Sequence, residues 1–260
     1  MNRPIVRSSH RAIVSLVRRG VATLFAVLAV VTTAFAQDST KKERAVKGTG
    51  DISFAKTGGN TDVLSLGMSD KLTWTVSPRF ALKQQFGWIY GQTDGVSTAN
   101  ALLTGIRGEY SASKRLIVFA GFNYDYNLFA GVKRRFEEYA GLGFVVVDKP
   151  KDILRFDVGL SEFQEWERYV DTSYNFTAGR LAGDYKHLFT EKAYFQEIAE
   201  FLPNFKTSED YRFNSETALV APLTGGIAIK VGYIVRYRGQ PPEGIKKTDT
   251  VFRTGVQITY

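Results

Sequence analysis

Long stretches in which apolar and polar residues strictly alternate are the feature that most constrains this chain. Between residues 227 and 238 every second side chain is apolar, and the intervening positions carry alanine, lysine, glycine, isoleucine and two arginines. Segments 79–90, 115–126 and 152–161 repeat the pattern. A period of two places alternate side chains on opposite faces of an extended strand, whereas a helix would scatter them around its circumference. The chain is therefore predicted to be all-β.

Turn signals divide the alternating region into about 12 strands, an even number that is typical of outer-membrane barrels. Five short connections are predicted, at VSPR, SASKR, VDKPKD, LFTEK and APLTGG. Six longer and more polar connections are predicted at TGGNTD, YGQTDGVST, NLFAGVKRR, EFQEWERYVD, LPNFKTSED and RGQPPEGIKKTD. Both ends of the chain would then lie on the side of the short turns.

Two architectures use strands with one apolar and one charged face. In a soluble sandwich or small barrel the apolar face points inward, whereas in a membrane barrel it meets lipid and the charged face lines an enclosed lumen. The long strands, the aromatic residues near strand ends and the unequal connections favour the membrane barrel. We therefore predict a closed antiparallel transmembrane β-barrel of about 12 strands and a single domain. Asp70 and Glu138 fall on the apolar face and do not fit the pattern.

The N-terminal stretch predicts export. Five arginines and no acidic residue precede the apolar run VATLFAVLAVVTTAFA, which ends in the triplet Ala34-Phe35-Ala36. This order is typical of a cleaved secretory signal peptide, predicted at residues 1–36, followed by a flexible lead-in at 37–47 and the barrel at 48–260. A membrane anchor would need about 20 uninterrupted apolar residues. A twin-arginine signal at Arg18 and Arg19 is the other alternative, although the flanking residues match it poorly.

The net charge argues against a nucleic-acid partner, and the cysteine content excludes stabilisation by disulfides. The signal holds five of the 34 basic residues and none of the 26 acidic ones, so the net charge falls from +8 to +3 on its removal. A nucleic-acid partner is therefore not expected. The chain contains no cysteine, so the fold has to be stable without disulfides.

No catalytic, metal or cofactor site is predicted. A serine hydrolase needs a base beside its serine, but the one histidine of the predicted mature chain, His187, lies beside the short turn LFTEK and is interpreted as a polar residue at the periplasmic rim. Ser161 in the sequence GLS is not followed by the strand-to-helix turn of a nucleophile elbow. The acidic residues Glu162, Glu165, Glu167 and Asp171 are interpreted as a solvated loop, since they lack the spacing of a calcium loop. A lipid-directed enzyme therefore stays the least favoured function.

Several short motifs resemble one known family. They are TGGNTD (57–62), FAGVKRR (129–135) with GLG (141–143), DYRFNSET (210–217) with APLT (221–224), and QPPEGIKKTDT (240–250). Together they resemble the YdiY-like salt-induced outer-membrane proteins, the domain of unknown function 481, over most of residues 50–260. The resemblance implies an outer-membrane barrel of Gram-negative bacteria and brings no established activity.

The last strand predicts how the ring closes. Its apolar face runs to the final residue, and GVQITY is similar to the barrel-assembly signal of outer-membrane proteins. The signal residues are Gly255, Val256, Ile258 and Tyr260. We expect this strand to pair with the first one and to be recognised by the barrel-assembly machinery.

The inward faces are predicted to be basic. The candidate lumen-lining residues are Lys83, Arg107, Arg155, Arg180, Arg212, Lys230, Arg236 and Arg253. Glu109, Asp157, Asp184 and Glu216 are the acids assigned to the same faces. The leading functional prediction is a narrow passive pore for small anions or acidic solutes, because a lumen with several unpaired bases would favour anions. The alternative is a closed interior. If the charges pair across the lumen, the protein would be a non-conducting structural or stress-related barrel.

One further site is predicted in a long external loop. Lys133, Arg134 and Arg135 lie next to Phe129 and Phe136, and basic side chains beside aromatic ones suit the phosphates of lipopolysaccharide. An ordinary solvated loop is the alternative. Outer-membrane lipid and lipopolysaccharide are thus the expected partners.

Overall fold

The computed structural model describes residues 45–58, 63–93, 96–169 and 173–260. The predicted signal peptide and nearly all of the predicted lead-in lie outside the described residues. Among the described residues there is no helix that is both long and apolar enough to cross a membrane. The strands are β1 (Val46–Gly58), β2 (Val63–Ser77), β3 (Phe80–Thr93), β4 (Val96–Ser111), β5 (Leu116–Asn127), β6 (Val132–Asp148), β7 (Asp152–Glu167), β8 (Ser173–Leu188), β9 (Tyr194–Leu202), β10 (Arg212–Thr224), β11 (Ile227–Arg238) and β12 (Thr248–Thr259).

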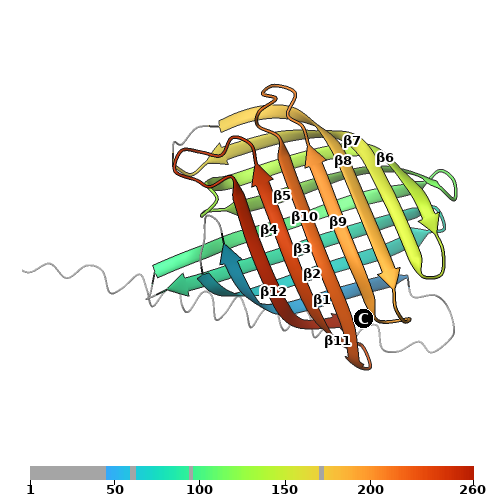
Figure 1. Ribbon diagram of the computed structural model, residues 1–260. Helices are drawn as coiled ribbons and strands as arrows, with labels where there is room; N and C mark the ends of the chain where they lie inside the picture. The colour runs from blue at the N-terminus through green and yellow to red at the C-terminus, as the bar shows by residue number, and fades with distance from the viewer. Residues whose placement is uncertain (1–44, 59–62, 94–95, 170–172) are drawn as a thin grey trace, which may run out of the picture. The chain divides into compact units, whose positions relative to one another are not determined.

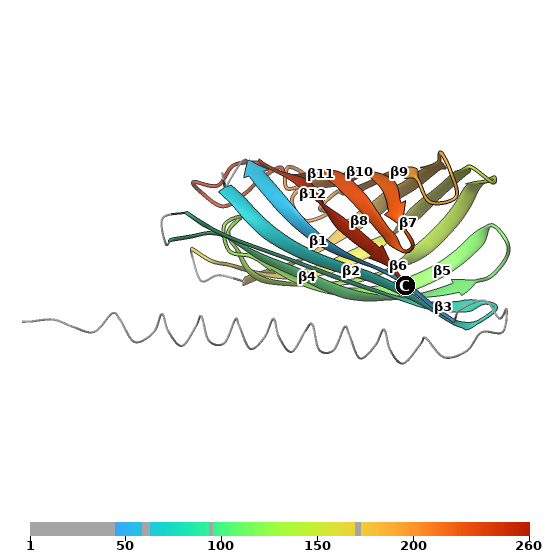
Figure 2. The same ribbon diagram turned by 90° about the horizontal axis from the view of Figure 1, so that it is seen from below.

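The twelve strands form a closed antiparallel barrel, as predicted. Each strand pairs with its neighbours in sequence, and β12 pairs with β1 to complete the ring (Figure 1). Figure 2 shows β1 and β12 side by side at this seam. Closure leaves no sheet edge unpaired, which is what a hydrocarbon environment requires of a β structure.

The two faces of the wall differ as the alternation predicts. On β7, Val158 and Leu160 are 38% and 56% exposed, whereas Ser161 is only 1% exposed. Large apolar side chains are thus exposed on the outer face, and polar ones are buried on the inner face. A soluble barrel would show the reverse, so the soluble alternative is wrong. The outer surface suits lipid.

Five short turns lie at one end of the barrel, here called the turn end, and the other connections lie at the loop end. The count of five and six connections is confirmed, but the loop-end connections are shorter than predicted. β3 and β4 continue until only residues 94–95 separate them, and β7 continues to Glu167. These residues have a composition typical of turns but continue the strands, because each added residue makes further backbone hydrogen bonds with a long neighbouring strand. The two longest loop-end connections are those between β9 and β10, residues 203–211, and between β11 and β12, residues 239–247.

Two aromatic rings on the inner face of the wall lie against glycines of neighbouring strands. Phe119 and Tyr139 pack with their ring centroids 6.2 Å apart. A Cβ atom on Gly121 would meet the Tyr139 ring, and one on Gly141 would lie 2.8 Å from the Phe119 ring. These glycines are needed because a larger residue would collide with the rings.

Candidate functional site: the charged lumen

Ion pairs between strands that are not neighbours show which side chains point into the lumen. Arg107 on β4 pairs with Asp157 on β7 at 2.7 Å, and Arg155 on β7 pairs with Glu109 on β4 at 2.9 Å. Two strands, β5 and β6, separate β4 from β7 in the wall. Such contacts can only pass through the interior, so these four side chains face one another across it.

The predicted basic residues are mostly matched by acids. Seven of the eight form ion pairs: Lys83 with Glu109, Arg107 with Asp157, Arg155 with Glu109, Arg180 with Glu137 and Glu200, Arg212 with Glu165, Lys230 with Asp51, and Arg253 with Glu216. The eighth, Arg236, lies opposite Asp249 in the β11–β12 register. The described lumen therefore has paired charges rather than a free positive lining.

Three glutamates organise these pairs, each beside three basic side chains. Glu109 contacts Lys83, Arg107 and Arg155 at 2.9, 2.8 and 2.9 Å. Glu216 contacts Lys71, Lys230 and Arg253 at 3.7, 3.4 and 3.1 Å. Glu165 contacts Arg135, Arg212 and Arg238 at 3.4, 3.0 and 2.8 Å. A carboxylate has about four lone-pair positions, so one glutamate can hold several donors at once.

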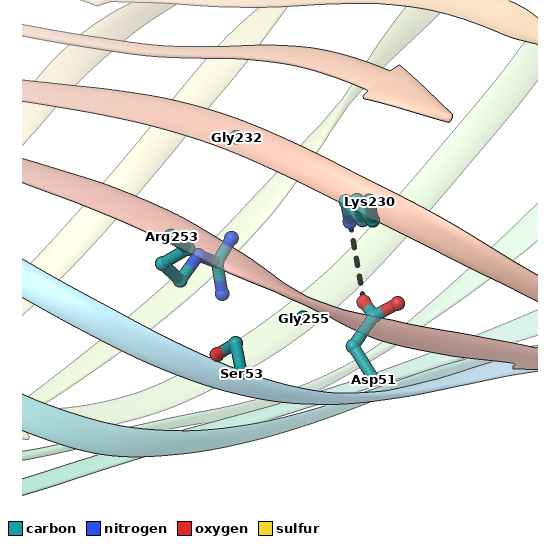
Figure 3. Close-up of a pocket in the computed structure, with 6 residues that line it drawn as sticks. All are labelled: Asp51, Ser53, Lys230, Gly232, Arg253 and Gly255. Carbon is teal, nitrogen blue, oxygen red and sulfur yellow. Dashed lines mark hydrogen bonds and ion pairs between the residues drawn. The ribbon is translucent and has the colours of Figure 1, made fainter. Parts of the chain in front are cut away.

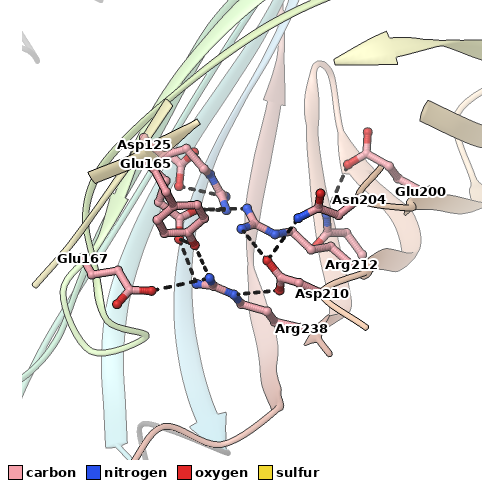
Figure 4. Close-up of polar contacts among 11 residues, drawn as sticks. Asp125, Glu165, Glu167, Glu200, Asn204, Asp210, Arg212 and Arg238 are labelled. Carbon is pink, nitrogen blue, oxygen red and sulfur yellow. Dashed lines mark hydrogen bonds and ion pairs between the residues drawn. The ribbon is translucent and has the colours of Figure 1, made fainter. Parts of the chain in front are cut away.

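Glu165 is the most enclosed of the three. Its residue exposure is 0%, and the hydroxyl of Tyr174 donates to its Oε1 at 2.6 Å. Figure 4 shows Arg212 and Arg238 directed at this carboxylate. The participating residues come from β6, β7, β8, β10 and β11. The cluster therefore joins widely separated parts of the wall near the loop end.

Further groups hold the three arginines in place. Asp125 accepts two hydrogen bonds from Arg135, from Nε at 2.9 Å and from Nη2 at 3.0 Å. Asp210, in the β9–β10 connection, accepts one from Nε of Arg238 at 3.2 Å (Figure 4). The guanidinium of Arg212 lies 4.8 Å from the ring centroid of Phe176. Hydrogen bonds and ring contacts therefore restrict the arginines to the geometry that meets Glu165.

The sequence interpretation missed Glu165. The stretch from Glu162 to Glu167 was expected in a solvated loop, and this is wrong because it forms the end of β7. Alternation then turns Glu165 inward and leaves Glu162 on the outer face. The signal was present in the continued alternation of SEFQEWE, although its acidic composition suggested a loop. Asp171 lies outside the described residues.

A small pocket lies on the inner face at the seam. Asp51, Ser53, Lys230, Gly232, Arg253 and Gly255 line it. Lys230 bridges to Asp51 at 3.2 Å, as Figure 3 shows. A Cβ atom on Gly255 would lie 2.7 Å from Cα of Ser53, so the glycine permits the close approach of β12 to β1. The charged walls of this pocket are also paired.

The predicted closure residues lie along the seam. Val256 pairs with Ile52 and Ile258 with Gly50, while Gly255 pairs with Ser53. Tyr260 continues the ladder through two backbone hydrogen bonds of 3.0 Å with Gly48. The expected pairing of the last strand with the first is confirmed. Recognition of these residues by the assembly machinery stays a prediction.

A family model described as "Protein of unknown function, DUF481" matches residues 50–260. This chain belongs to that family. The predicted family membership is therefore confirmed, and the match covers all of the barrel except the first residues of β1.

Solved structures similar to this DUF481 member are membrane barrels. One, described as a NanC porin structure, has a TM-score of 0.53 at 12% identity and covers 80% of this chain and 98% of the other. Another, the translocator domain of the autotransporter NalP from Neisseria meningitidis, has a TM-score of 0.51 at 10% identity and covers 94% and 97%. At these identities the likeness shows the fold alone. A search of curated proteins found no match.

The three basic residues predicted to bind lipopolysaccharide do not lie together in an external loop. Lys133, Arg134 and Arg135 were expected in a loop, but all three belong to β6. Strand pairing with β7 extends through this segment, with a bulge between Val132 and Arg134. Arg135 points inward and binds Asp125 and Glu165, so it is removed from any external lipid. Lys133 and Arg134 are exposed.

His187 and Ser161 lie far apart. His187 Nδ1 is 2.8 Å from Asp152 at the turn end, where Tyr185 also donates to Asp152 at 2.9 Å. Ser161 is buried and donates to Glu137 at 2.7 Å. Ser161 is opposite Ala178, nine positions before His187 on β8, or roughly 30 Å along a strand. These two residues cannot act as a nucleophile and its base. No group of three metal-ligand residues occurs within the part of the chain that the structure describes.

Proposed function

We propose that this protein is a non-conducting outer-membrane barrel whose lumen is closed by ion pairs. The observation that carries the proposal is the fully buried Glu165, which holds Arg135, Arg212 and Arg238 together inside the ring. The Glu109 and Glu216 clusters repeat the arrangement elsewhere in the lumen. Paired charges of this kind obstruct a passage rather than line one.

The energetics support a closed interior. Removing one partner of a buried ion pair typically costs about 3–5 kcal/mol, because the other charge is left without compensation. An opening that separated Glu165 from three arginines would face a cost of this order. A passive solute offers little to compensate for it, so the clusters keep the barrel shut and mechanically stiff.

An outer-membrane location agrees with the exposed apolar outer face and with the predicted signal peptide. The fold shared with membrane barrels supports the same location. In this setting the apolar residues contact acyl chains, and recognition of the last strand would deliver the chain to the assembly machinery. The role is structural and belongs to the envelope, without catalysis or a cofactor.

Planar-bilayer recordings of the purified full chain test the proposal. The wild type should give no discrete openings in a salt gradient. Glu165→Ala should give openings that prefer anions, since three arginines lose their shared carboxylate. Glu162→Gln, a change on the outer face of the same strand, is the matched control and should stay silent. Discrete openings of the wild type would contradict the proposal.

The second candidate is the narrow passive pore for small anions or acidic solutes. It is favoured by the likeness to a structure described as a porin and by the number of basic lumen residues. Wild-type openings with a reversal potential for anions would establish it, and cation preference would reject it. A lipid-directed enzyme would require lipid hydrolysis that disappears in His187→Ala.

A further inference from the structure

Two arginines on the outside of the barrel differ from those in the lumen. Arg134 near the start of β6 and Arg168 just after β7 are both exposed at the loop end. The guanidinium of Arg134 lies 4.1 Å from the ring centroid of Trp166. That of Arg168 lies 5.3 Å from the centroid of Phe129 and 5.5 Å from that of Tyr169. Aromatic faces rather than acids position both groups.

Among the described residues, no ion pair occupies the hydrogen-bond donors of these two arginines. Within the described ranges, no carboxylate lies at ion-pair distance from Arg134 or Arg168, whereas seven of the eight predicted lumen bases have one. Arg168 uses Nη1 to donate to the carbonyl of Leu128 at 2.7 Å, which fixes its orientation. A guanidinium has five N–H donors in its plane, so stacking on a ring leaves them free for a planar or tetrahedral anion.

The position of these arginines corresponds to the level of lipid headgroups. On the side of these arginines that faces the turn end, the ring centroids of Tyr124 and Phe136 are 5.1 Å apart. The ring centroids of Phe136 and Trp166 are 5.8 Å apart, with the two rings nearly perpendicular. Exposed aliphatic residues follow, among them Leu142 and Leu160. Aromatic girdles mark the membrane interface, so cations just beyond a girdle face phosphates.

A pair of acidic residues on the same outer face indicates which class of lipid binds there. Glu138 and Glu162 lie directly opposite each other on β6 and β7, and the Thr177 hydroxyl donates to Glu162 at 2.6 Å. They are four positions from Arg134 and Trp166, or roughly 13 Å along the strands. Carboxylates facing a membrane need hydrogen-bond donors. A glycerophospholipid has none at this depth, but lipid A has amide and hydroxyacyl groups below its phosphates.

We propose that the outer face of β6 and β7 binds one lipid A moiety of lipopolysaccharide. Arg134 and Arg168 hold a phosphate, the rings below them contact the sugar and upper acyl chains, and Glu138 and Glu162 accept hydrogen bonds from amide and hydroxyl groups. This site lies outside the barrel and does not depend on whether the lumen conducts.

Titration of the detergent-purified full chain with bisphosphorylated lipid A, followed by native mass spectrometry, tests the site. Arg134→Glu with Arg168→Glu should lower the affinity at least tenfold. The matched control is Lys114→Glu with Arg115→Glu, an equal change of charge at the turn end, which should bind as the wild type does. Equal affinity of the two double variants would overturn the proposal.

Two further probes test the lipid class. Dephosphorylated lipid A should bind at least tenfold more weakly to the wild type, and phosphatidylglycerol should also bind more weakly than lipid A. Glu138→Leu with Glu162→Leu removes the acceptors without an unpaired charge and should reduce the preference over phosphatidylglycerol several-fold. Equal binding of lipid A and phosphatidylglycerol to the wild type would refute the assignment.

Discussion

The hydroxyl of Tyr260 donates a hydrogen bond of 2.6 Å to the carboxylate of Asp70, although 190 residues separate them in the chain. Tyr260 follows β12 and Asp70 lies on β2, so the contact crosses β1 on the outer face. Gly48 makes room for it, since a Cβ atom there would be 2.6 Å from the tyrosine ring. The acid that did not fit the apolar face therefore has a role in holding the seam.

Loss of this hydrogen bond should destabilise the closed barrel. Tyr260→Phe removes only the hydroxyl and is expected to lower the free energy of unfolding by about 1–2 kcal/mol, because the acceptor is charged and partly buried. Urea unfolding in lipid vesicles measures the change. In a double-mutant cycle with Asp70→Asn the two effects should not add; strictly additive losses would show that the contact contributes nothing.

The same contact should respond to alkaline pH. Burial, followed by the hydrogen bond to Asp70 and its negative charge, raises the pKa of Tyr260 above its ordinary value. The folded state then keeps a proton that the unfolded state loses above about pH 10, so the stabilisation is complete below that pH and declines as the pH rises. The stability difference between wild type and Tyr260→Phe should shrink from pH 9 to pH 11. A stability difference that stays constant over this pH range would contradict the raised pKa of Tyr260.

Removal of the buried lumen carboxylate of Glu165 should lower the free energy of unfolding more than removal of the outer carboxylate of Glu162. Glu165→Ala leaves Arg135, Arg212 and Arg238 without their shared, fully buried carboxylate, and a loss of about 3–5 kcal/mol in the free energy of unfolding is expected. Glu162→Gln, three residues away on the outer face, should cause no loss. The measurement is again unfolding in vesicles, and equal effects of the two changes would contradict a closed Glu165 cluster.

Two facing glycines should tolerate no side chain. Gly141 and Gly159 are opposite each other on β6 and β7, and a Cβ atom on Gly141 would lie 2.7 Å from Cα of Gly159. Since backbone atoms cannot move away as a flexible side chain can, Gly141→Ala is expected to reduce the yield of folded barrel severalfold. Gly183→Ala is the control, because a Cβ atom there meets nothing within 4 Å. Folded yield can be followed by heat-modifiable mobility on gels.

Much of the architecture could be predicted because it depends on local patterns. Alternation of period two assigns each side chain to a face, and this assignment held for residues as different as Leu160 and Arg155. The strand number and the pairing of the last strand with the first followed from the turn signals and the apolar terminal strand. Composition misled where strands continued through polar stretches, as at Lys133–Arg135 and at Glu162–Glu167.

The pairing of charges could not be predicted, because it depends on which residues closure brings to one level of the lumen. Arg238 and Glu165 are 73 residues apart and meet across the interior only after the stagger of every intervening strand is set. The sequence by itself determined that ionised side chains face inward and apolar ones outward, through the period of the strand. Only the tertiary structure decided that most of those inward charges neutralise one another, since a partner's identity depends on three-dimensional distance rather than on order along the chain.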